Sequence, residues 1–372
     1  MELLKLRNHI PIGAPARREP ADGSETDMRV SLGFEPAWFS KRCGVDFSET
    51  WHLDPYYRCN TLEKMKQELL RAFPTVPNWD LANHDDLATI SGCYGAYVIP
   101  RAFGIPLRYA TERWPELDRQ EPFTVEEIER MDADKLLSGA FVDELFRQMD
   151  LLEKGFGKIH GYLNWQGVLN NAFHLRKQEV FIDLVERPKF AHQMFSLITD
   201  VMIRFAKMVQ ERQRKSGFYT NHLVAGNCTV SMISPGAYRE FIFPCDKRIA
   251  ESFERFGVHT CNWDVTPYIE VLKPLPKLGY LDMGIMTDMA RVKNSFPDAR
   301  RAVIYHPNTL QTADLETIAA DMKKIKRDLA PCDVVMADIS ESTSDERVNA
   351  FLTICRDLES KGDQRSSRTR WT

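Results

Sequence analysis

Apolar residues recur along this chain with two spacings, one typical of amphipathic helices and one typical of short buried strands. The clearest helical stretch covers residues 188–213, where apolar side chains return every three or four positions and Arg187-Pro188 marks the start. Residues 314–329 repeat this spacing, and residues 348–358 do so more briefly. These segments predict helices that bury one face against a core.

Short apolar runs alternate with the helical stretches and predict eight strands. They cover residues 30–34, 87–91, 158–162, 221–225, 257–261, 280–283, 302–306 and 334–338. Strands that alternate with crossover helices are typical of a parallel sheet, and eight such units predict an α/β fold, a single-domain (β/α)8 TIM barrel. The alternative is a doubly wound open sheet, but no GxGxxG motif follows the first strand to support it.

The two ends of the chain differ from the part between them. Residues 1–27 are rich in Pro, Gly, Arg and Glu without apolar periodicity, and residues 361–372 are polar and basic. We therefore expect an N-terminal extension, one barrel over residues 28–360 and a disordered C-terminal tail. The length of 372 residues fits one domain, because barrels commonly exceed ~250 residues.

Composition excludes several classes of protein. Apolar residues make up 43% and charged residues 27%, which is ordinary for a globular protein with a large core. With 49 basic and 53 acidic residues and no long basic run, the chain is not expected to bind nucleic acid. No segment reaches the ~18 apolar residues that span a bilayer, and no apolar signal-peptide core occurs, so we expect a cytoplasmic protein without membrane contact. Its eight cysteines show no CxxC pairs and are expected to be free thiols.

Reactive side chains gather where the predicted strands end. In a barrel, active sites are built at the C-terminal ends of the strands. The residues found there are Ser91, His259 with Cys261, Asp282, His306 and Asp338. As a group they indicate a catalytic face.

His259 and Cys261 are the strongest candidates for chemistry. They lie two residues apart at the end of a strand, so both side chains point to the same side. An imidazole nitrogen and a thiolate are preferred zinc ligands, and a catalytic zinc takes three protein ligands with one position left open. The alternative is a buried core thiol beside a hydrogen-bonded histidine.

Three residues are candidates for the third ligand. Asp338 ends the last predicted strand, and Cys228 follows another strand, so both belong to the catalytic face. Cys332 precedes the last strand and falls on the opposite face. We favour Asp338 slightly over Cys228.

Other residues fit supporting roles. Asp282 and His306 end strands, where they could orient a substrate or a ligand, or make only a structural hydrogen bond. Trp263 directly follows the proposed ligand pair, and Trp51 and His52 begin an aromatic segment. Aromatic walls around a few polar groups suit a flat or methylated ligand, and the alternative for the aromatic segment is a lid or a subunit interface.

The order of these segments resembles that of the uroporphyrinogen decarboxylase-like superfamily. In that superfamily a helix start like Ile233-Ser234-Pro235 precedes a His-x-Cys strand end, as in LVAGNCTVSMISPGAYREFIFPCDKRIAESFERFGVHTCNWDVTPYIEVL. The segment VFIDLVERPKFAHQMFSLITD is similar to the preceding helix region. The resemblance covers roughly residues 28–358 and implies a (β/α)8 barrel.

The superfamily implies two chemistries, which are metal-free decarboxylation of uroporphyrinogen and zinc-dependent methyl transfer involving a corrinoid. The decarboxylases carry an RQAGRY-like segment and an FSD-like turn, where this chain reads LGFEPAWF and ATISGCYG. A substrate with eight carboxylates needs several convergent arginines. The lack of these two decarboxylase segments therefore disfavours decarboxylation. The methyltransferases carry His-x-Cys-Gly and a third Cys near the last strand, where this chain has Asn262 and Ala337-Asp338-Ile339.

The resemblance therefore implies a zinc-dependent methyltransferase that moves a methyl group between a small methylated compound or thiol and a corrinoid. Catalytic roles fall to His259, Cys261 and Asp282, and metal ligation falls to His259, Cys261 and either Asp338 or Cys228. No corrinoid-binding DxHxxG motif occurs, so the corrinoid would come from a partner protein or as a free co-substrate. A homodimer is a further expectation. The alternatives are a metal-free decarboxylase or lyase and a non-catalytic barrel that binds a corrinoid or tetrapyrrole.

Overall fold

Seven strands form one parallel sheet in the computed structural model, which describes residues 6–7, 21, 27–74 and 89–366. The neighbours follow the order β1-β2-β9-β8-β7-β6-β5. The bounds are β1 Leu6–Arg7, β2 Met28–Phe34, β5 His222–Gly226, β6 Arg255–His259, β7 Leu278–Met283, β8 Arg300–Ile304 and β9 Cys332–Ile339. Neighbouring strands from β5 to β9 are consecutive in the sequence, as successive β/α units require.

Two isolated parallel β-bridges extend the sheet beyond β5. Gln166 pairs in parallel with Gly226, and Thr89 pairs in parallel with His160. The segments around Thr89 and His160 occupy the second and third strand positions, so eight positions are present and the fold is a (β/α)8 barrel, as the sequence predicts. Regular strand pairing at the third position is thus shorter than predicted, and at the second position residues 87 and 88 of the predicted strand lie outside the described residues.

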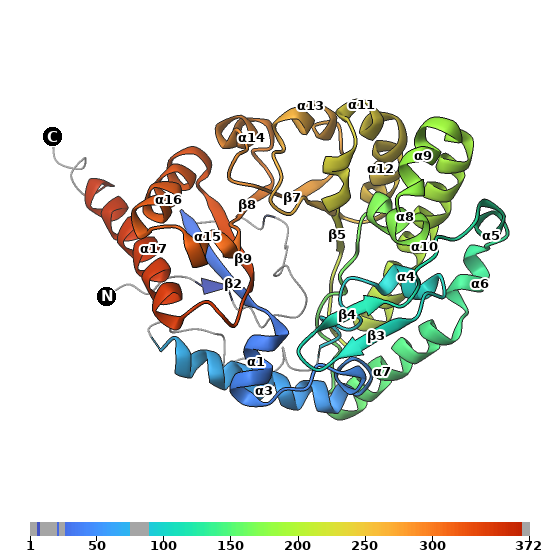
Figure 1. Cartoon of the computed structure of the whole chain (residues 1–372), viewed down its shortest axis with the longest axis horizontal. Coiled ribbons are helices and arrows are strands. Elements are labelled where there is room, and N and C mark those ends of the chain that lie inside the picture. Colours follow the sequence, from blue (N-terminus) through green and yellow to red (C-terminus); the bar gives the residue numbers. More distant parts are fainter. Residues whose placement is uncertain (1–5, 8–20, 22–26, 75–88, 367–372) are drawn as a thin grey trace.

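Helices surround the strands in an outer ring (Figure 1). The first half contains α1 Pro36–Cys43, α2 Glu49–Leu53, α3 Pro55–Ala72, α4 Val98–Ala102, α5 Val125–Glu129, α6 Ala133–Leu137, α7 Ala140–Phe156, α8 Val168–Arg176 and α9 Glu179–Glu186. The second half contains α10 Pro188–Lys215, α11 Pro235–Ala237, α12 Phe243–Ser252, α13 Ile269–Leu272, α14 Met289–Ser295, α15 Pro307–Thr312, α16 Leu315–Leu329 and α17 Asp345–Ser366. Strands covered on both faces need apolar residues throughout, which explains why β6 to β9 are buried almost without interruption.

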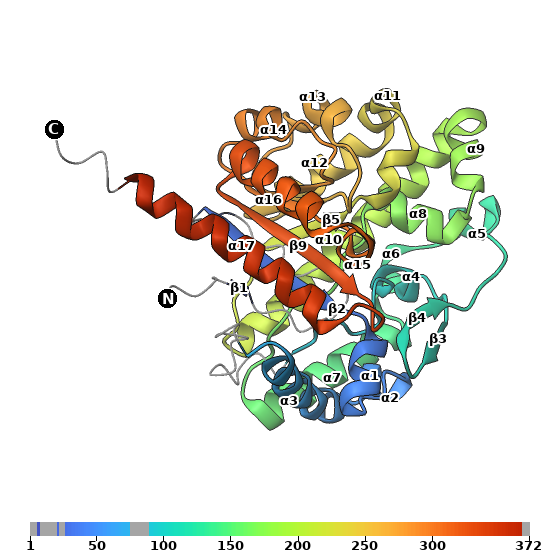
Figure 2. The ribbon, with the colours of Figure 1, turned by 60° about the vertical axis from the view of Figure 1, so that its left-hand side comes forward.

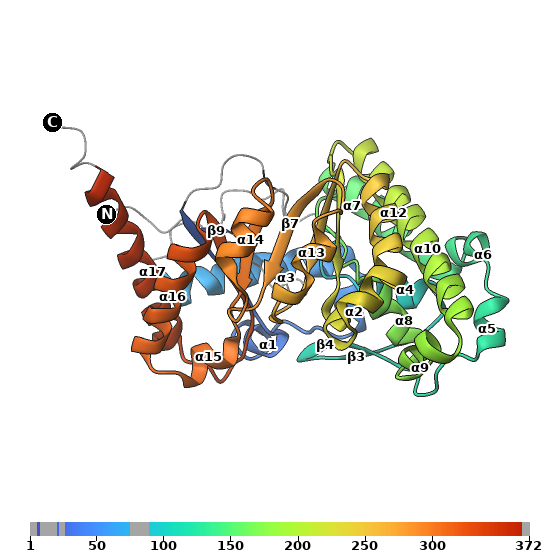
Figure 3. The same ribbon diagram turned by 90° about the horizontal axis from the view of Figure 1, so that it is seen from above.

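Irregular turns and a hairpin complete the chain. The hairpin consists of β3 Leu107–Ala110 and β4 Arg113–Leu117. Short 3-10 turns cover Cys228–Met232 (η2) and Thr266–Tyr268 (η4), and a π-helical turn covers Tyr238–Ile242 (η3). The hairpin lies with α1, α9 and α15 along the lower edge of the molecule in Figure 3. Because α1 and α15 directly follow β2 and β8, this edge is the C-terminal face of the barrel.

The predicted long helices are confirmed, and their ends have local causes. Pro188 begins α10, where its fixed backbone and missing N–H suit the first turn. Asp314 caps α16 by accepting the N–H of Thr317 at 2.6 Å. Figure 2 shows α17 running beside β9 and β2. Among the described residues, no helix has both the length and the apolar character needed to cross a membrane.

Both ends of the chain depart from the expected boundaries. Residues 361–366, predicted as part of a loose tail, continue α17, because no proline interrupts the helix there. Leu6 and Arg7, within the predicted extension, pair with Val30 and Ser31 at the edge of the sheet. An edge strand has unpaired backbone groups that a second segment can satisfy. Residues 1–5, 8–20, 22–26, 75–88 and 367–372 lie outside the described residues.

Candidate metal centre

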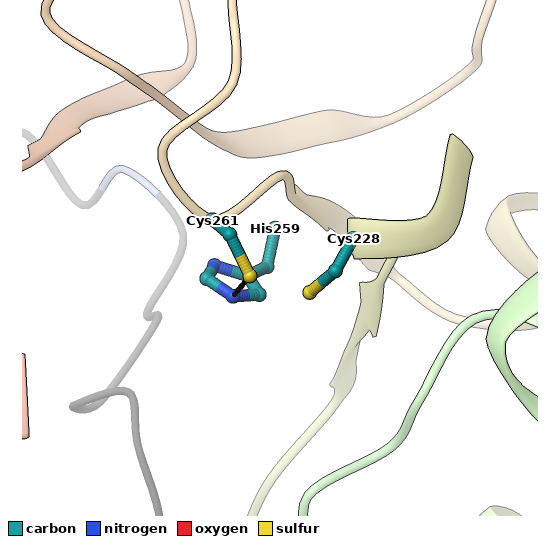
Figure 4. Close-up of side chains that lie close together, drawn as sticks. All are labelled: Cys228, His259 and Cys261. Atoms are coloured by element: carbon teal, nitrogen blue, oxygen red, sulfur yellow. Dashed lines mark hydrogen bonds between the residues drawn. The ribbon is translucent and has the colours of Figure 1, made fainter. Parts of the chain in front are cut away.

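Three side chains that could bind one metal ion meet at the C-terminal ends of β5 and β6. His259 is the last residue of β6 and is paired with Gly226, the last residue of β5. Cys228 and Cys261 each lie two residues beyond this pair, so the parallel register brings them to the same edge. Figure 4 shows the sulfur of Cys261 next to the imidazole ring of His259, with the sulfur of Cys228 pointing toward both.

The distances within this cluster are short. One ligand atom from each of Cys228, His259 and Cys261 lies within 4.8 Å of the other two. The Cys261 Sγ atom is 3.2 Å from the His259 Nε2 atom, the contact drawn as a dashed line in Figure 4. His259 is buried, and both cysteines are half-buried, so the cluster is sheltered without being sealed.

Asp282, at the end of β7, determines which imidazole nitrogen faces the sulfur atoms. Its Oδ2 atom is 2.6 Å from His259 Nδ1, and its Oδ1 atom accepts the Thr260 N–H at 2.7 Å. Tyr280 donates its hydroxyl to the same carboxylate at 3.0 Å. Because an ionised carboxylate only accepts hydrogen bonds, Nδ1 carries the imidazole proton and Nε2 keeps its lone pair for a ligand. Asp282 therefore fixes the orientation of the His259 ring, and a catalytic role for Asp282 stays a prediction.

The backbone turn that carries Cys261 is strained and held by a close contact. Cys261 has a φ of 60°, a left-handed conformation that few residues other than glycine adopt. The next residue, Asn262, packs on Gly284, where an added Cβ would lie 1.9 Å from the Asn262 carbonyl oxygen. Gly284 also donates its N–H to the Trp263 carbonyl at 3.0 Å. Strain of this kind is retained where the surroundings enforce it, often at functional sites.

The turn that carries Cys228 is fixed by hydrogen bonds on both sides. Asn227 donates its backbone N–H to the His259 carbonyl at 2.7 Å and its side-chain amide to Asp246 Oδ2 at 2.8 Å. Thr229 donates its N–H to Asn170 Oδ1 at 2.9 Å. The sequence analysis missed Asn170, Asn227 and Asp246. Asp246 had a signal, because it is an acidic residue within an apolar helical stripe that includes Ile242, Cys245 and Ile249.

The structure corrects the preference for Asp338 as the third ligand. Asp338 ends β9, but β8 and β7 lie between β9 and β6. Three steps of strand spacing place the ends of β9 and β6 about 14 Å apart along the sheet. β5 is the immediate neighbour of β6, so Cys228 and not Asp338 completes the cluster. Cys332 begins β9 at the opposite face, as expected.

The predicted substrate-binding residues occupy different surroundings. Trp263, two residues after Cys261, is partly buried and packs edge-to-face on Tyr268, with ring centroids 4.9 Å apart. His306 is exposed and caps α15, where its Nδ1 atom accepts the Asn308 N–H at 3.1 Å. Its observed role is structural, and a role in substrate binding stays a prediction.

Trp51 and His52 are completely buried, which places them in the core. The Trp51 indole donates to the Thr61 hydroxyl at 3.0 Å, and His52 Nδ1 accepts the Tyr94 N–H at 3.1 Å. Burial and the Arg58 guanidinium lower the pKa of His52 to about 3, so the ring is neutral. Neither side chain is accessible to a substrate in this conformation.

The donor set fits a catalytic zinc ion. Ligand atoms around a tetrahedral zinc lie about 3.6–3.8 Å from one another, so the three atoms need only small side-chain adjustments. Two sulfurs and one imidazole nitrogen are a soft set that favours zinc over magnesium or calcium. No fourth His, Cys, Asp or Glu from the described part of the chain joins the cluster. Three protein ligands leave one position for a reactant.

Comparison with known proteins gives one family and a shared fold. The family model described as Uroporphyrinogen decarboxylase (URO-D) matches residues 75–311, which is more than half of the chain. The search of curated proteins found no match to this chain. A solved methyltransferase from Methanosarcina mazei has 15% sequence identity and a TM-score of 0.62, and the match covers 94% of this chain and 96% of that one.

A second solved structure is less similar. It is a B12-independent methionine synthase from a Shewanella species in complex with selenomethionine, with 12% identity and a TM-score of 0.42. The match covers 90% of this chain and 97% of that one. This likeness is too weak to carry an argument, whereas the likeness to the methyltransferase shows a common fold.

Proposed function

Because the chain belongs to the uroporphyrinogen decarboxylase family, we propose that it is a zinc-dependent methyltransferase of that family. It would move a methyl group between a small methylated compound or a thiol and a corrinoid. The observation that carries this proposal is the cluster of Cys228, His259 and Cys261, with one ligand atom from each within 4.8 Å of the others. Metal-free decarboxylation has no need for two thiols and an imidazole around one point.

The residues of this cluster have separate tasks in the proposed reaction. His259, Cys228 and Cys261 would hold the zinc, and Asp282 would keep His259 Nε2 unprotonated and aimed at it. Zinc bound there would supply a Lewis acid, which lowers the pKa of a thiol acceptor or polarises the atom that leaves when a methyl group departs. Trp263 would form an apolar wall next to the open position and limit the access of water.

The corrinoid and the methyl compound are the proposed partners. The chain contains no DxHxxG motif, so the corrinoid would arrive free or on a separate protein. The same fold supports a methyltransferase in Methanosarcina mazei, which makes this chemistry compatible with the barrel.

Metal content tests the proposal first. We expect about one zinc per chain in protein purified with zinc present and dialysed, and loss of most of it in Cys261→Ser and Cys228→Ser. Asp338→Ala is the matched control, because it removes a strand-end side chain that is not part of the cluster, and its zinc content should equal that of the wild type. Elemental analysis measures all four proteins.

Activity then separates the proposal from its alternatives. The zinc-loaded wild type should transfer the methyl group of methylcobalamin to a thiol, and Cys228→Ser should lose this activity. A wild type that binds no zinc contradicts the proposal and directs attention to decarboxylation. A wild type that binds zinc and a corrinoid without any methyl transfer supports a binding protein instead.

A further inference from the structure

A buried carboxyl group lies behind the turn that carries Cys228. Asp246, on α12, is completely buried. Its Oδ2 atom accepts two hydrogen bonds of 2.8 Å, one from the Asn227 side-chain amide and one from the Tyr238 hydroxyl. Its Oδ1 atom and the Asn227 Oδ1 atom have no hydrogen-bond partner among the described residues.

This arrangement does not favour stability. A buried carboxylate costs several kcal/mol unless a cation or enough hydrogen bonds compensate for lost hydration. Asp246 has no ion-pair partner in the part of the chain that the structure describes, and burial raises its pKa to about 6 although the bonds from Tyr238 and Asn227 lower it. Polar groups kept at such a cost occur often at functional sites.

Asn227 connects Asp246 to the metal cluster. It directly precedes Cys228, and its backbone N–H donates to the carbonyl of His259, the central ligand. Its side chain passes close to Gly167, where an added Cβ would lie 1.9 Å from Asn227 Oδ1. Asp246 on one side and the Gly167 backbone on the other therefore restrict the Asn227 side chain to one orientation.

The helix before Asp246 is adapted to this contact. Tyr238 begins the π-helical turn between α11 and α12 and is completely buried. A π turn inserts an additional residue into a helix and changes which side chains face inward, and such turns are frequent at functional sites. The Tyr238 hydroxyl thereby provides the second donor that fixes the Asp246 carboxyl group.

We propose that Asp246 is a positioning residue for the third metal ligand, which holds the turn that aims the Cys228 sulfur at His259 and Cys261 through the Asn227 amide. Cys228 then has a supporting carboxylate, as His259 has in Asp282. The metal role in this inference rests on the proposed function, but the placement of the sulfur does not. Loss of groups that orient ligands typically lowers metal affinity about 10–100-fold.

Zinc affinity gives the first test, measured by competition with a chromophoric chelator. Asp246→Ala and Asn227→Ala should lower the affinity about tenfold or more. In a Cys228→Ser background the same two changes should have no further effect, because Asp246 acts only through Cys228. Equal losses of affinity in both backgrounds would show a general structural role and overturn the inference.

Two further variants serve as controls. Asp321→Ala removes another carboxyl group that accepts a tyrosine hydroxyl, from Tyr305 at 2.7 Å, but far from the cluster on α16. Its zinc affinity should match that of the wild type. Asp246→Asn keeps the size of the side chain and one acceptor oxygen, so it should restore most of the affinity that Asp246→Ala loses.

A second test needs no metal and separates this inference from the proposed function. In metal-free protein, phenylarsine oxide bonds to two neighbouring thiols with release of one water, so its affinity reports the placement of Cys228 relative to Cys261. Wild type should bind it more tightly than Cys228→Ser, and Asp246→Ala and Asn227→Ala should lose that difference. Wild-type affinity in both variants, or no Cys228-dependent binding in the wild type, overturns the inference. If the wild type binds no zinc, the proposed function fails. The affinity for phenylarsine oxide then still tests whether Asp246 positions Cys228.

Discussion

At the residue scale, the two oxygens of Asp282 have different partners, and this makes the carboxylate hard to replace. One oxygen accepts the Thr260 N–H and the other contacts His259 Nδ1. An asparagine has only one acceptor oxygen. If that oxygen accepts from Thr260, the amide NH2 faces His259 and moves the imidazole proton to Nε2, where it blocks metal binding.

Asp282→Asn should therefore lower zinc affinity about 10–100-fold, measured by chelator competition. Tyr280→Phe is the matched control, because it removes only a hydroxyl that donates to Asp282 at 3.0 Å. Its affinity should stay close to that of the wild type. Unchanged affinity in Asp282→Asn would show that the carboxylate does not select the tautomer.

The buried carboxyl of Asp246 should also make stability depend on pH. Burial raises its pKa from 3.8 to about 6, so the folded state holds the proton more tightly than the unfolded state. The stability that this group contributes is present below pH 4 and is lost as the pH rises to 6. The shift corresponds to about 3 kcal/mol at most.

Asp246→Asn removes this titration. The free energy of unfolding of the variant relative to the wild type should rise between pH 4 and 6 and then level off. Urea unfolding at several pH values measures this difference. Parallel stability curves for the two proteins would contradict the prediction.

At the element scale, the turn after β6 depends on the absence of a side chain after β7. A Cβ at Gly284 would lie 1.9 Å from the Asn262 carbonyl oxygen, and backbone cannot yield as a flexible side chain can. Gly284→Ala should destabilise the protein by about 2 kcal/mol or more and displace Cys261 from the cluster. Thermal unfolding and zinc content measure the two effects.

Gly236→Ala is the control for that substitution. Gly236 lies in α11, and the nearest atom to an added Cβ is Ser234 Oγ at 3.6 Å, an ordinary contact. Alanine favours helix over glycine by up to about 1 kcal/mol, so this variant should keep its stability and its zinc. Equal behaviour of the two variants would refute the role given to the turn.

At the scale of the whole molecule, one buried and two partly buried histidines should determine the response to acid. Burial lowers the pKa of His52 to about 3, helped by Arg58, and lowers those of His174 and His222 to about 4. Each is neutral in the folded state and takes up a proton on unfolding below pH 6.5. Their contribution to stability is therefore full above pH 6.5 and is lost as the pH falls toward 4 and, for His52, toward 3.

His52→Gln tests this at the most buried of the three positions. Between pH 6 and 4, the free energy of unfolding of the variant should fall less steeply than that of the wild type. The two slopes should differ by about 1.4 kcal/mol per pH unit, the value for one proton. Urea titrations across this range measure the slope. An unchanged slope in His52→Gln would show that the ring is not held neutral.

The sequence by itself determined the periodic parts of this protein. Six of the eight predicted strand positions are regular strands near the expected bounds, because a strand covered on both faces needs a continuous apolar run that is visible locally. The long helices were equally readable from their apolar stripes. The sequence also paired His259 with Cys261, although Cys261 lies in a left-handed turn beyond the end of β6 and not on the strand whose period of two suggested the pairing.

Tertiary structure decided what completes the site. The choice between Cys228 and Asp338 depends on which strands are neighbours, and β5 adjoins β6 whereas β9 does not. The role of Asp246 depends on a helix returning its side chain to the turn before Cys228. Trp51 and His52 were expected near a substrate but lie in the core. A local pattern records periodicity and polarity, whereas contacts between distant segments follow from how the whole barrel packs.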